Sequence, residues 1–336
     1  MTQAIDLRSD TVTRPSAAMK SAMNDAPVGD DVFGDDPTVN RLQATLAERL
    51  GFEAGLFCAS GTQSNLTALM AHCQRGDEYI VGQEAHTYRY EAGGAAVLGS
   101  IQPQPILNQP DGSIALADIA AAIKPDDVHF ARSRLLALEN TIGGKVLPLS
   151  YLQEAGELAK SRGLGYHLDG ARMFNAAVKL GVPGADVCRG FDSVSICLSK
   201  GLGAPVGSVL CGSRDLIKQA HRWRKMLGGG MRQAGVLAAA GLFALEHNVE
   251  RLAEDHENAA SLAKGLTEIA ELRLEPMQTN IVYVHVPAAR CEDLRLHLAQ
   301  RGIIALIGPK TRLVTHLDVS AAQIQQVVHA FKEFFA

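Results

Sequence analysis

The sequence lacks an apolar run long enough to cross a membrane. Its longest runs, such as IVYVHV at 281–286, are far shorter than the roughly 20 residues that a spanning helix needs. The first residues, MTQAIDLRSDTVTRP, contain no apolar signal core, so we expect a cytoplasmic protein. A charge excess is also missing, because 32 Lys and Arg stand against 36 Asp and Glu. That balance attracts neither nucleic acid nor an anionic membrane surface.

The six cysteines form no CxxC pair, and four of them lie in apolar or alanine-rich surroundings. They are Cys58, Cys73, Cys188, Cys197, Cys211 and Cys291. This distribution predicts reduced, buried thiols, and it argues against a metal site and against a disulfide scaffold.

Short apolar segments alternate with helical ones through most of the chain. Strands are expected at 79–82, 96–98, 134–138, 164–168, 192–198 and 206–211, with helices between them, for example at 151–162 and 171–180. These strands are apolar on both faces. The pattern predicts an α/β fold, in which a mostly parallel sheet is flanked by helices.

Differences in composition and hydrophobic pattern along the sequence predict three parts of the chain. Residues 1–37 are polar and rich in turn signals, which indicates an N-terminal arm. Residues 38–247 form the large α/β domain, and 248–336 form a small C-terminal α+β domain. The composition, 47% hydrophobic and 20% charged, is that of an ordinary globular protein.

The stretch DSVSICLSKGLGAPVGS at 192–208 ends an apolar strand at Lys200 and continues into a loop of small residues. Thirty-one residues earlier, Asp169 in LGYHLDGARMF also ends an apolar strand and precedes a helix. One strand, a crossover helix and the next strand occupy about that length. We therefore expect Asp169 and Lys200 at the same carboxyl-end edge of the sheet, where ligands bind in open α/β folds.

Two further segments add a phosphate site and a flat ring. In CASGTQSN, Gly61 and Thr62 lie at a strand-to-helix turn, where free N–H groups and the helix dipole favour a phosphate. In QEAHTYRYEAGG, His86 has aromatic neighbours. Taken singly, each feature has a plain structural alternative: Asp169 as a helix N-cap, SGT as a common turn, His86 as a surface or core histidine.

Together these groups suit pyridoxal 5′-phosphate. Lys200 is an amine that can bond covalently to the cofactor aldehyde. Asp169 would keep the pyridine nitrogen protonated, so that the ring accepts the electrons left when a bond at Cα breaks. The helix N-terminus would hold the phosphate, and His86 would fix the tilt of the ring.

Nine segments, in order along essentially the whole chain, resemble the low-specificity L-threonine aldolases, which are fold type I pyridoxal-phosphate enzymes related to aspartate aminotransferase. They are DLRSDTVTRP, GDDVFGDDPTVNRLQ, ASGTQSN, EAHTYRYEAGG, LLALEN, HLDGARMFNAA, ICLSKGLGAPVGS, RWRKMLGGGMRQAG and RLVTHLDV. One position departs from the family, which often has a histidine after ENT where this chain has Ile142.

The resemblance implies retro-aldol cleavage of L-threonine and L-allo-threonine to glycine and acetaldehyde, with low selectivity at the β-carbon. Lys200, His86 and Asp169 would be the catalytic residues, and Gly61 and Thr62 would hold the phosphate. His86 would also lie near the β-hydroxyl of the substrate.

The resemblance assigns the substrate carboxylate to Arg172, with Ser9 and Arg312 completing the grip. Arg172 lies three residues beyond Asp169, about one helical turn along, so it faces the same site and suits a bidentate bond to a carboxylate. The alternative is that Arg172 forms a structural ion pair.

Other assignments involve a second subunit. Lys225 and Arg232, in the basic run HRWRKMLGGGMRQ, would reach the cofactor phosphate across a dimer interface, and the family suggests a tetramer of two such dimers. The alternative for this run is a solvated helix face. His129 is a further candidate near the β-hydroxyl, while Tyr90 and Phe33 would line the pocket.

Three other functions compete with this interpretation. A nicotinamide oxidoreductase would use GLGAPVG as its fingerprint, but Pro205 and a β-rich segment follow where a helix should begin, and no acid for the ribose lies about 20 residues on. A non-catalytic binding protein would leave the intact cofactor set unexplained. A β-eliminating lyase, or an aldolase preferring L-allo-threonine or a bulky side chain, shares the cofactor and is separated by its products.

Overall fold

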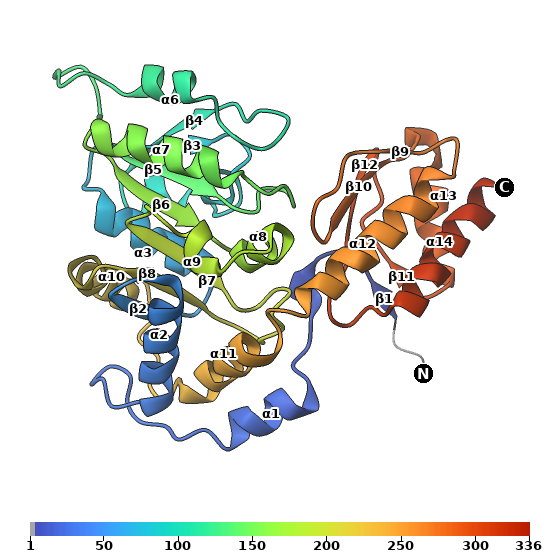
Figure 1. The fold of residues 1–336 in the computed structure, drawn as a ribbon, viewed down its shortest axis with the longest axis horizontal. Helices are drawn as coiled ribbons and strands as arrows, with labels where there is room; N and C mark the ends of the chain where they lie inside the picture. Colours follow the sequence, from blue (N-terminus) through green and yellow to red (C-terminus); the bar gives the residue numbers. More distant parts are fainter. Residues whose placement is uncertain (1–3) are drawn as a thin grey trace.

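A seven-stranded sheet forms the centre of the larger lobe in the computed structural model, which describes residues 4–336 (Figure 1). Its strands are β2 (Ala54–Cys58), β3 (Asp77–Gly82), β4 (Gln102–Ile106), β5 (Arg132–Glu139), β6 (Gly165–Asp169), β7 (Ser193–Cys197) and β8 (Ser208–Gly212). They are ordered β2-β8-β7-β6-β5-β3-β4. Strand β8 is antiparallel to both of its neighbours, and the other pairs are parallel. The predicted α/β fold with a mostly parallel sheet is confirmed.

Helices cover both faces of this sheet. They are α1 (Ala17–Asn24), α2 (Pro37–Leu50), α3 (Gly61–His72), α4 (His86–Arg89), α5 (Gly94–Val97), α6 (Leu116–Ala122), α7 (Leu149–Ser161), α8 (Met173–Leu180), α9 (Gly184–Val187), α10 (Arg214–Met226) and α11 (Gly235–His247). One face packs against α2, α7, α8, α9 and α11. The opposite face packs against α3, α5 and α10.

Alternating residues of the central strands explain why these strands are apolar on both faces. In β5, Leu136 and Leu138 join the core beneath α7, whereas Leu135 and Ala137 join the core beneath α3. Successive side chains of a strand point to opposite faces, so each strand supplies both cores.

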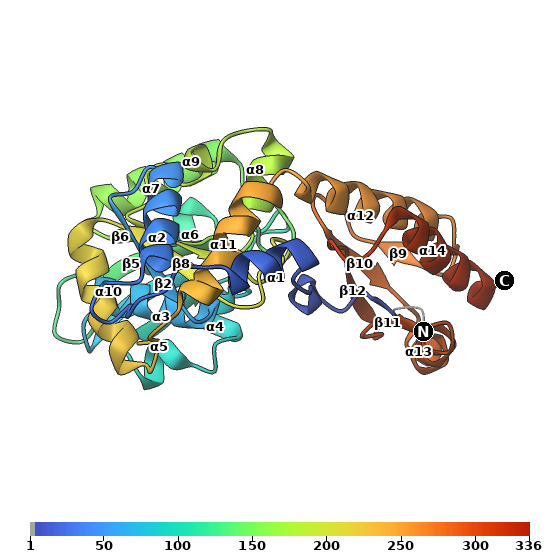
Figure 2. The ribbon, with the colours of Figure 1, turned by 90° about the horizontal axis from the view of Figure 1, so that it is seen from below.

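The smaller lobe is built on a three-stranded antiparallel sheet, ordered β12-β10-β9 (Figures 1 and 2). Its elements are α12 (Leu252–Thr267), β9 (Arg273–Leu274), β10 (Ile281–His285), the 3-10 turn η2 (Ala288–Arg290), α13 (Cys291–Gln300), β11 (Ile303–Ile304), β12 (Lys310–Val314) and α14 (Ala321–Phe335). Helix α12 joins the lobes, because Leu252 belongs to the core of the large lobe and Ala259 to that of the small one.

The N-terminal arm touches both lobes. Strand β1 (Ile5–Asp6) pairs in parallel with β11, a strand of the small lobe. The 3-10 turn η1 (Asp10–Val12) follows, and α1 then packs against α11. The boundaries at 37 and 247 stay predictions, since the arm has no separate core of its own among the described residues.

One predicted strand is wrong. The segment 96–98 lies at the end of the short helix α5, and the edge position of the sheet is taken by β4 instead. Strand β4 reads QPQPI and is not among the predicted strands. An edge strand tolerates proline because one side of its backbone pairs with no neighbour.

The absences noted in the sequence have structural counterparts. No helix within residues 4–336 is both long enough and apolar enough to span a bilayer. All six cysteines lie in the described part of the chain, none is in a disulfide, and five are buried. The predicted reduced, buried thiols are therefore confirmed for five of the six.

Candidate active site

The carboxyl ends of neighbouring strands bring the predicted catalytic groups to one edge of the sheet. Asp169 ends β6 and pairs in register with Glu139, the last residue of β5, on one side and with Ser195 of β7 on the other. Lys200 lies in the loop that follows β7, where its carbonyl accepts a hydrogen bond of 2.9 Å from Thr13 Oγ1 of the arm. The predicted meeting of Asp169 and Lys200 at the same edge follows from this topology.

Small residues after Lys200 let the chain turn back at once into β8. Gly207 has a φ of 107°, and a Cβ there would lie 2.6 Å from the Phe57 ring. A Cβ on Gly201 would lie 2.8 Å from Leu252. The turn needs glycine for close approach and for left-handed backbone. A strand follows GLGAPVG, so the segment is not a dinucleotide fingerprint.

The N-terminus of α3 has the features of a phosphate site. Ser60 caps the helix through its Oγ, which accepts from Gln63 N at 3.2 Å, and Gly61 and Thr62 form the first turn. Ser208 Oγ is buried beside Gly61 and has no hydrogen-bond partner among residues 4–336. Buried hydroxyls are rarely left unpaired. An anion at this helix end would use the hydroxyl and the exposed N–H groups, so the residues present fit a phosphate.

A cavity of about 460 Å³ is lined by four of the predicted residues and by Glu139, the neighbour of Asp169 in the sheet. The four predicted residues are His86, Tyr90, Arg172 and Arg312. The His86 and Tyr90 rings lie 5.8 Å apart. Residues separated by more than 200 positions in the sequence therefore meet in one cavity, which is the arrangement the sequence analysis predicted for a substrate pocket.

His86 is held between two carboxylates. Its Nδ1 lies 2.9 Å from Glu91 Oε1, and its backbone N–H donates to Glu139 Oε2 at 2.7 Å. The hydrogen bond to Glu91 raises the pKa of His86 and the negative charge of Asp169 adds to this rise, although burial opposes it. Burial raises the pKa of Glu139, and the nearby charge of Asp169 raises it further.

Arg172 faces the cavity and also forms an ion pair with the buried Asp10. Its Nε donates to Asp10 Oδ2 at 2.7 Å and its Nη2 to Asp10 Oδ1 at 2.5 Å. Burial alone would raise the pKa of Asp10, but the charge of Arg172 holds that pKa well below its usual range. Ser9 lies beside the pair, with its Oγ 3.4 Å from Asp10 Oδ1. The ion pair predicted as the alternative is therefore present, and the carboxylate-binding role of Arg172 stays a prediction.

Nine predicted residues are not among those that line this cavity. Five of them belong to the edge of the sheet, the helix end and the arm described above, and they are Ser9, Gly61, Thr62, Asp169 and Lys200. The other four are Lys225, Arg232, His129 and Phe33. Lys225 is exposed at the end of α10, and Arg232 donates to Asp30 Oδ2 at 2.9 Å. His129 binds Asp127 at 2.6 Å just before β5 begins, so it is on the order of 23 Å along the strand from Glu139. Phe33 is 76% exposed. The roles assigned to these residues stay predictions, and those of Lys225 and Arg232 require another subunit.

Ile142, where the family often has histidine, lines the same cavity and is almost fully buried. Its Cγ2 would lie 2.4 Å from a Cβ placed on Gly112. This wall of the pocket is therefore apolar and tightly packed, and Ile142 offers no group that could bond to a substrate hydroxyl.

Three polar residues of the site were quoted in the sequence analysis without a role. Glu139 ends the apolar strand β5 as Asp169 ends β6, so the same strand-end signal could have identified it. Asn65 and Glu91 carry no comparable signal. His86, Glu91 and Asp169 also place three possible metal-ligand atoms within 4.8 Å of one another, but Asn65 hydrogen-bonds both carboxylates there. The prediction of no metal stays a prediction.

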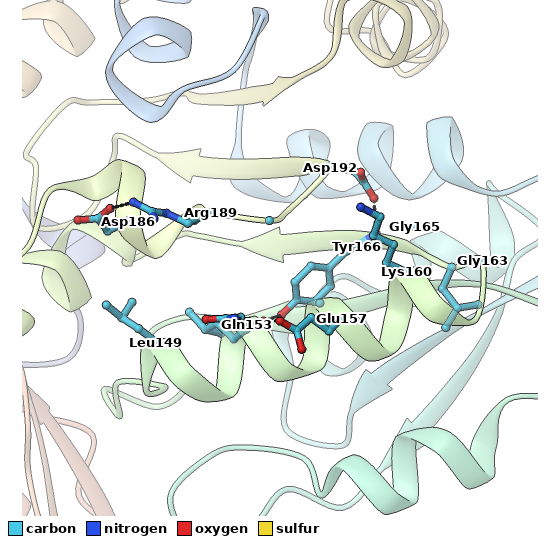
Figure 3. A pocket seen from close by; sticks show the side chains of 14 residues that line it. Leu149, Gln153, Glu157, Lys160, Gly163, Gly165, Tyr166, Asp186, Arg189 and Asp192 are labelled. Atoms are coloured by element: carbon cyan, nitrogen blue, oxygen red, sulfur yellow. Dashed lines mark hydrogen bonds and ion pairs between the residues drawn. The ribbon is translucent and has the colours of Figure 1, made fainter.

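A larger groove, of about 890 Å³, lies on the α7 side of the sheet and contains none of the predicted site residues (Figure 3). Its charged groups include the ion pair of Arg189 with Asp186. Tyr166 Oη donates to Leu152 O at 2.9 Å. These groups satisfy one another and do not converge on a common point, so the smaller cavity is the candidate active site.

Comparison with known proteins assigns the chain to a family. A profile of the family described as "Beta-eliminating lyase" matches residues 6–289. A low specificity L-threonine aldolase of Escherichia coli strain K12 is 57% identical over 332 residues, which cover 99% of both chains. The chain belongs to the family of low-specificity L-threonine aldolases. A third member, from Saccharomyces cerevisiae, is 39% identical and covers all of this chain and 87% of its own.

Solved structures agree on the fold. A threonine aldolase of Leishmania major has a TM-score of 0.85 at 22% identity, and the match covers 99% of this chain and 100% of that one. A serine palmitoyltransferase of Sphingomonas wittichii has a TM-score of 0.76 at 20% identity, covering 98% and 87%. At these identities the likeness concerns the fold alone, and it agrees with the layered architecture described above.

Proposed function

We propose that this member of the family is a pyridoxal-phosphate-dependent L-threonine aldolase. It cleaves L-threonine and L-allo-threonine to glycine and acetaldehyde, with low selectivity at the β-carbon. The observation that carries the proposal is the edge of the sheet where Asp169 pairs in register with Glu139, which lines a cavity together with Arg172 and Arg312. Arg172 also lines a small pocket with Lys200. The 57% identity to an aldolase of Escherichia coli supports the proposal.

The residues at this edge fit the cofactor. Lys200 would bond to the aldehyde, Asp169 would pair with the pyridine nitrogen, and Gly61 with Thr62 would hold the phosphate at the helix end. When bound there, pyridoxal phosphate supplies an electron sink for the pair released as the Cα–Cβ bond breaks. His86 would cover the ring from the cavity side.

The two arginines of the cavity suit the substrate carboxylate. Arg172 donates from Nε and Nη2 to Asp10, which fixes the plane of its guanidinium, and the side chain lines the cavity. Its Nη1 would be the group that binds the substrate carboxylate. Arg312 faces the same cavity from β12. Holding the carboxylate decides which bond at Cα stands perpendicular to the cofactor plane, and that bond is the one that breaks.

His86 suits removal of the proton from the β-hydroxyl. Its Nδ1–H donates to Glu91, which leaves Nε2 as the basic atom. The base takes the proton directly or through a water. A pocket that contacts the hydroxyl through one loosely held water accepts both β-configurations, and the apolar wall at Ile142 adds no second contact to distinguish them.

A β-eliminating lyase is the second candidate, because the profile that matches residues 6–289 bears that description. It would use the same lysine, aspartate and phosphate site. The two reactions differ in which bond leaves the substrate, so product analysis separates them.

The test is a product assay of the protein supplied with pyridoxal phosphate. We expect acetaldehyde and glycine in equal amounts from both L-threonine and L-allo-threonine. The matched control is Lys200→Ala, which we expect to lose turnover while keeping its fold. Release of ammonia and 2-oxobutyrate without acetaldehyde would contradict the aldolase assignment and favour the lyase.

We also propose a homo-oligomer, a tetramer made of two dimers with shared sites. The support is that Lys225, Arg232 and His129 lie away from their own cavity, and that Phe33 and Met226 are apolar side chains exposed by 76% and 71%. Light scattering should give about four times the subunit mass of 35.8 kDa. A monomer with full activity would contradict this proposal.

The remaining proposals concern location and partners. Six cysteines without disulfides suit a reducing compartment, which supports a cytoplasmic location. The net charge of −4 supports a small amino acid, rather than nucleic acid or a membrane surface, as the partner.

A further inference from the structure

Polar side chains are buried between α3 and the central sheet, where an ordinary helix-to-sheet contact would be apolar. Asn65 of α3, His167 of β6 and Ser193 of β7 are exposed by 2%, 0% and 0%. Burying such groups is costly unless each one is hydrogen-bonded. We call Asn65, His167, Ser193 and His72 the polar seam. The seam lies between α3 and the central sheet, and its hydrogen bonds show which groups it orients.

The seam is one continuous chain of hydrogen bonds that ends at the active site. His72 Nε2 lies 2.8 Å from Ser193 Oγ, which lies 2.8 Å from His167 Nδ1. His167 Nε2 lies 3.4 Å from Asn65 Oδ1. The Asn65 amide nitrogen then donates to Glu91 Oε1 at 2.9 Å and to Asp169 Oδ2 at 2.8 Å.

The chemistry of the groups fixes the direction of every bond. Asn65 Oδ1 can only accept, so His167 Nε2 donates to it. Burial lowers the pKa of His167 to about 3 and that of His72 to about 4, so both rings are neutral. His167 Nδ1 therefore accepts from the Ser193 hydroxyl, and Ser193 Oγ accepts from His72 Nε2–H. All hydrogens point toward the site.

The Asn65 amide holds two carboxylates together. Both hydrogens of its Nδ2 are used, one on Glu91 and one on Asp169. Without a shared donor, two buried carboxylates this close would repel each other. Asp169 Oδ1 is fixed separately by Ala171 N at 3.0 Å. The amide is also the last link of the seam, and because an amide does not readily pass protons on, the seam sets orientation rather than conducting protons.

We propose that Asn65 is a positioning residue of the active site, which fixes Asp169 against the pyridine nitrogen and Glu91 against His86 with one amide. The inference rests on the proposed function, since it assigns Asp169 to the cofactor ring and His86 to the face of that ring. Asn65 itself is buried, and both hydrogens of its amide are bonded to carboxylates. Its effect passes through the two carboxylates.

The decisive variant is Asn65→Asp, which is nearly isosteric. It keeps an oxygen that accepts from His167 Nε2–H, so the hydrogen bond between this residue and the rest of the polar seam is preserved. It replaces the two-hydrogen donor with a carboxyl group that donates one hydrogen when protonated and none when ionised. The control is Thr67→Val on the same helix, which removes a buried hydroxyl bonded to Ser64 O at 2.9 Å and outside the seam.

The main readout is the dissociation constant of pyridoxal phosphate for the apoprotein, measured by absorbance from acid to alkaline pH. For Asn65→Asp we expect a loss of affinity of about ten- to a hundredfold, increasing as pH rises because the new carboxyl group ionises and repels Asp169. The kcat should fall in parallel, while KM for L-threonine changes less than about threefold, because Arg172 and Arg312 are untouched. Thr67→Val should match the wild type.

The inference is overturned if Asn65→Asp binds pyridoxal phosphate as Thr67→Val does at every pH, whatever its melting temperature. If Asn65→Asp fails to fold, Asn65→Ala decides: a pH-independent loss of about tenfold supports the inference, and affinity within twofold of wild type overturns it. A wild-type protein that binds no pyridoxal phosphate overturns the proposed function and this inference together. Wild-type binding with lyase products, and weaker binding by Asn65→Asp, supports the inference while the aldolase proposal fails.

Discussion

The two faces of the central sheet carry different side chains, although the same strands supply both. Toward α7, α8 and α11 the strands β6 and β7 present apolar residues, which are Tyr166, Leu168, Val194 and Ile196. Toward α3 they present buried polar residues, which are His167, Asp169, Ser193 and Ser195. A single alternating strand thus separates the residues that stabilise the fold from those that organise the site.

The energetics of the two faces differ accordingly. Each fully buried leucine or isoleucine of the apolar face contributes on the order of 2 kcal/mol by leaving water. The hydrogen bonds of the polar face replace bonds to water, so their net contribution to the free energy of unfolding is small, but leaving any one of them unpaired is costly. The polar face is therefore better suited to fixing geometry than to adding stability.

The largest expected effect comes from Asp169→Asn on the polar face. The substitution keeps the size of the side chain, but its one amide oxygen can replace only one of the two carboxylate oxygens that accept from Asn65 and Ala171. It removes the charge opposite the pyridine nitrogen, so we expect kcat/KM for L-threonine to fall by about a hundredfold or more. The melting temperature should fall less than that of a leucine-to-alanine change on the apolar face, and calorimetry with steady-state kinetics measures both.

The neighbouring residue provides the matched comparison. Leu168 is fully buried on the apolar face, and Leu168→Ala should lower the free energy of unfolding by about 2–5 kcal/mol. Its kcat/KM, measured well below the melting temperature, should stay within about threefold of wild type. If Leu168→Ala loses as much activity as Asp169→Asn, the two faces do not divide stability and chemistry as we propose.

The sequence predicted this sheet and its edge because the signals are local. Apolar runs ended by Asp169 and by Lys200 are visible within a dozen residues, and parallel connections bring strand ends together. Glu139 ends β5 in the same way, but no catalytic role was predicted for it, because the cofactor chemistry requires only one carboxylate at the pyridine nitrogen. The strand predicted at 96–98 is wrong, because these residues end the short helix α5 and β4 takes the edge position instead.

Long-range pairing explains what the sequence did not predict. Asp10 meets Arg172 across 162 positions, and Asn65 meets Asp169 across 104. No spacing or periodicity relates such residues, since the packing of the arm and of α3 against the sheet decides which side chains meet. The same holds for His129. It lies before β5, at the end of that strand opposite to Glu139, and the sequence does not show this separation.

The smallest expected effect, and the sharpest probe of the polar face, is a shift in pH dependence with Glu91→Gln. The bond from His86 Nδ1–H to Glu91 raises the pKa of His86, and a base must be unprotonated at Nε2 to act. The acidic limb of the kcat/KM profile therefore reports that pKa in the free enzyme. Glutamine keeps an oxygen acceptor for Nδ1–H but removes the negative charge.

We expect the acidic limb of Glu91→Gln to move to lower pH, because His86 loses the charge that stabilised its protonated form. The maximal rate should change less than in Asp169→Asn, because the glutamine oxygen still accepts from Nδ1–H and keeps the orientation of the His86 ring. Glu292→Gln is the control, because Glu292 pairs with Arg295 on the surface of α13, outside the cavity, and should leave the profile unmoved. A limb that stays in place, or moves to higher pH, would show that His86 is not the base and that the carboxylates of the polar face act on the cofactor alone.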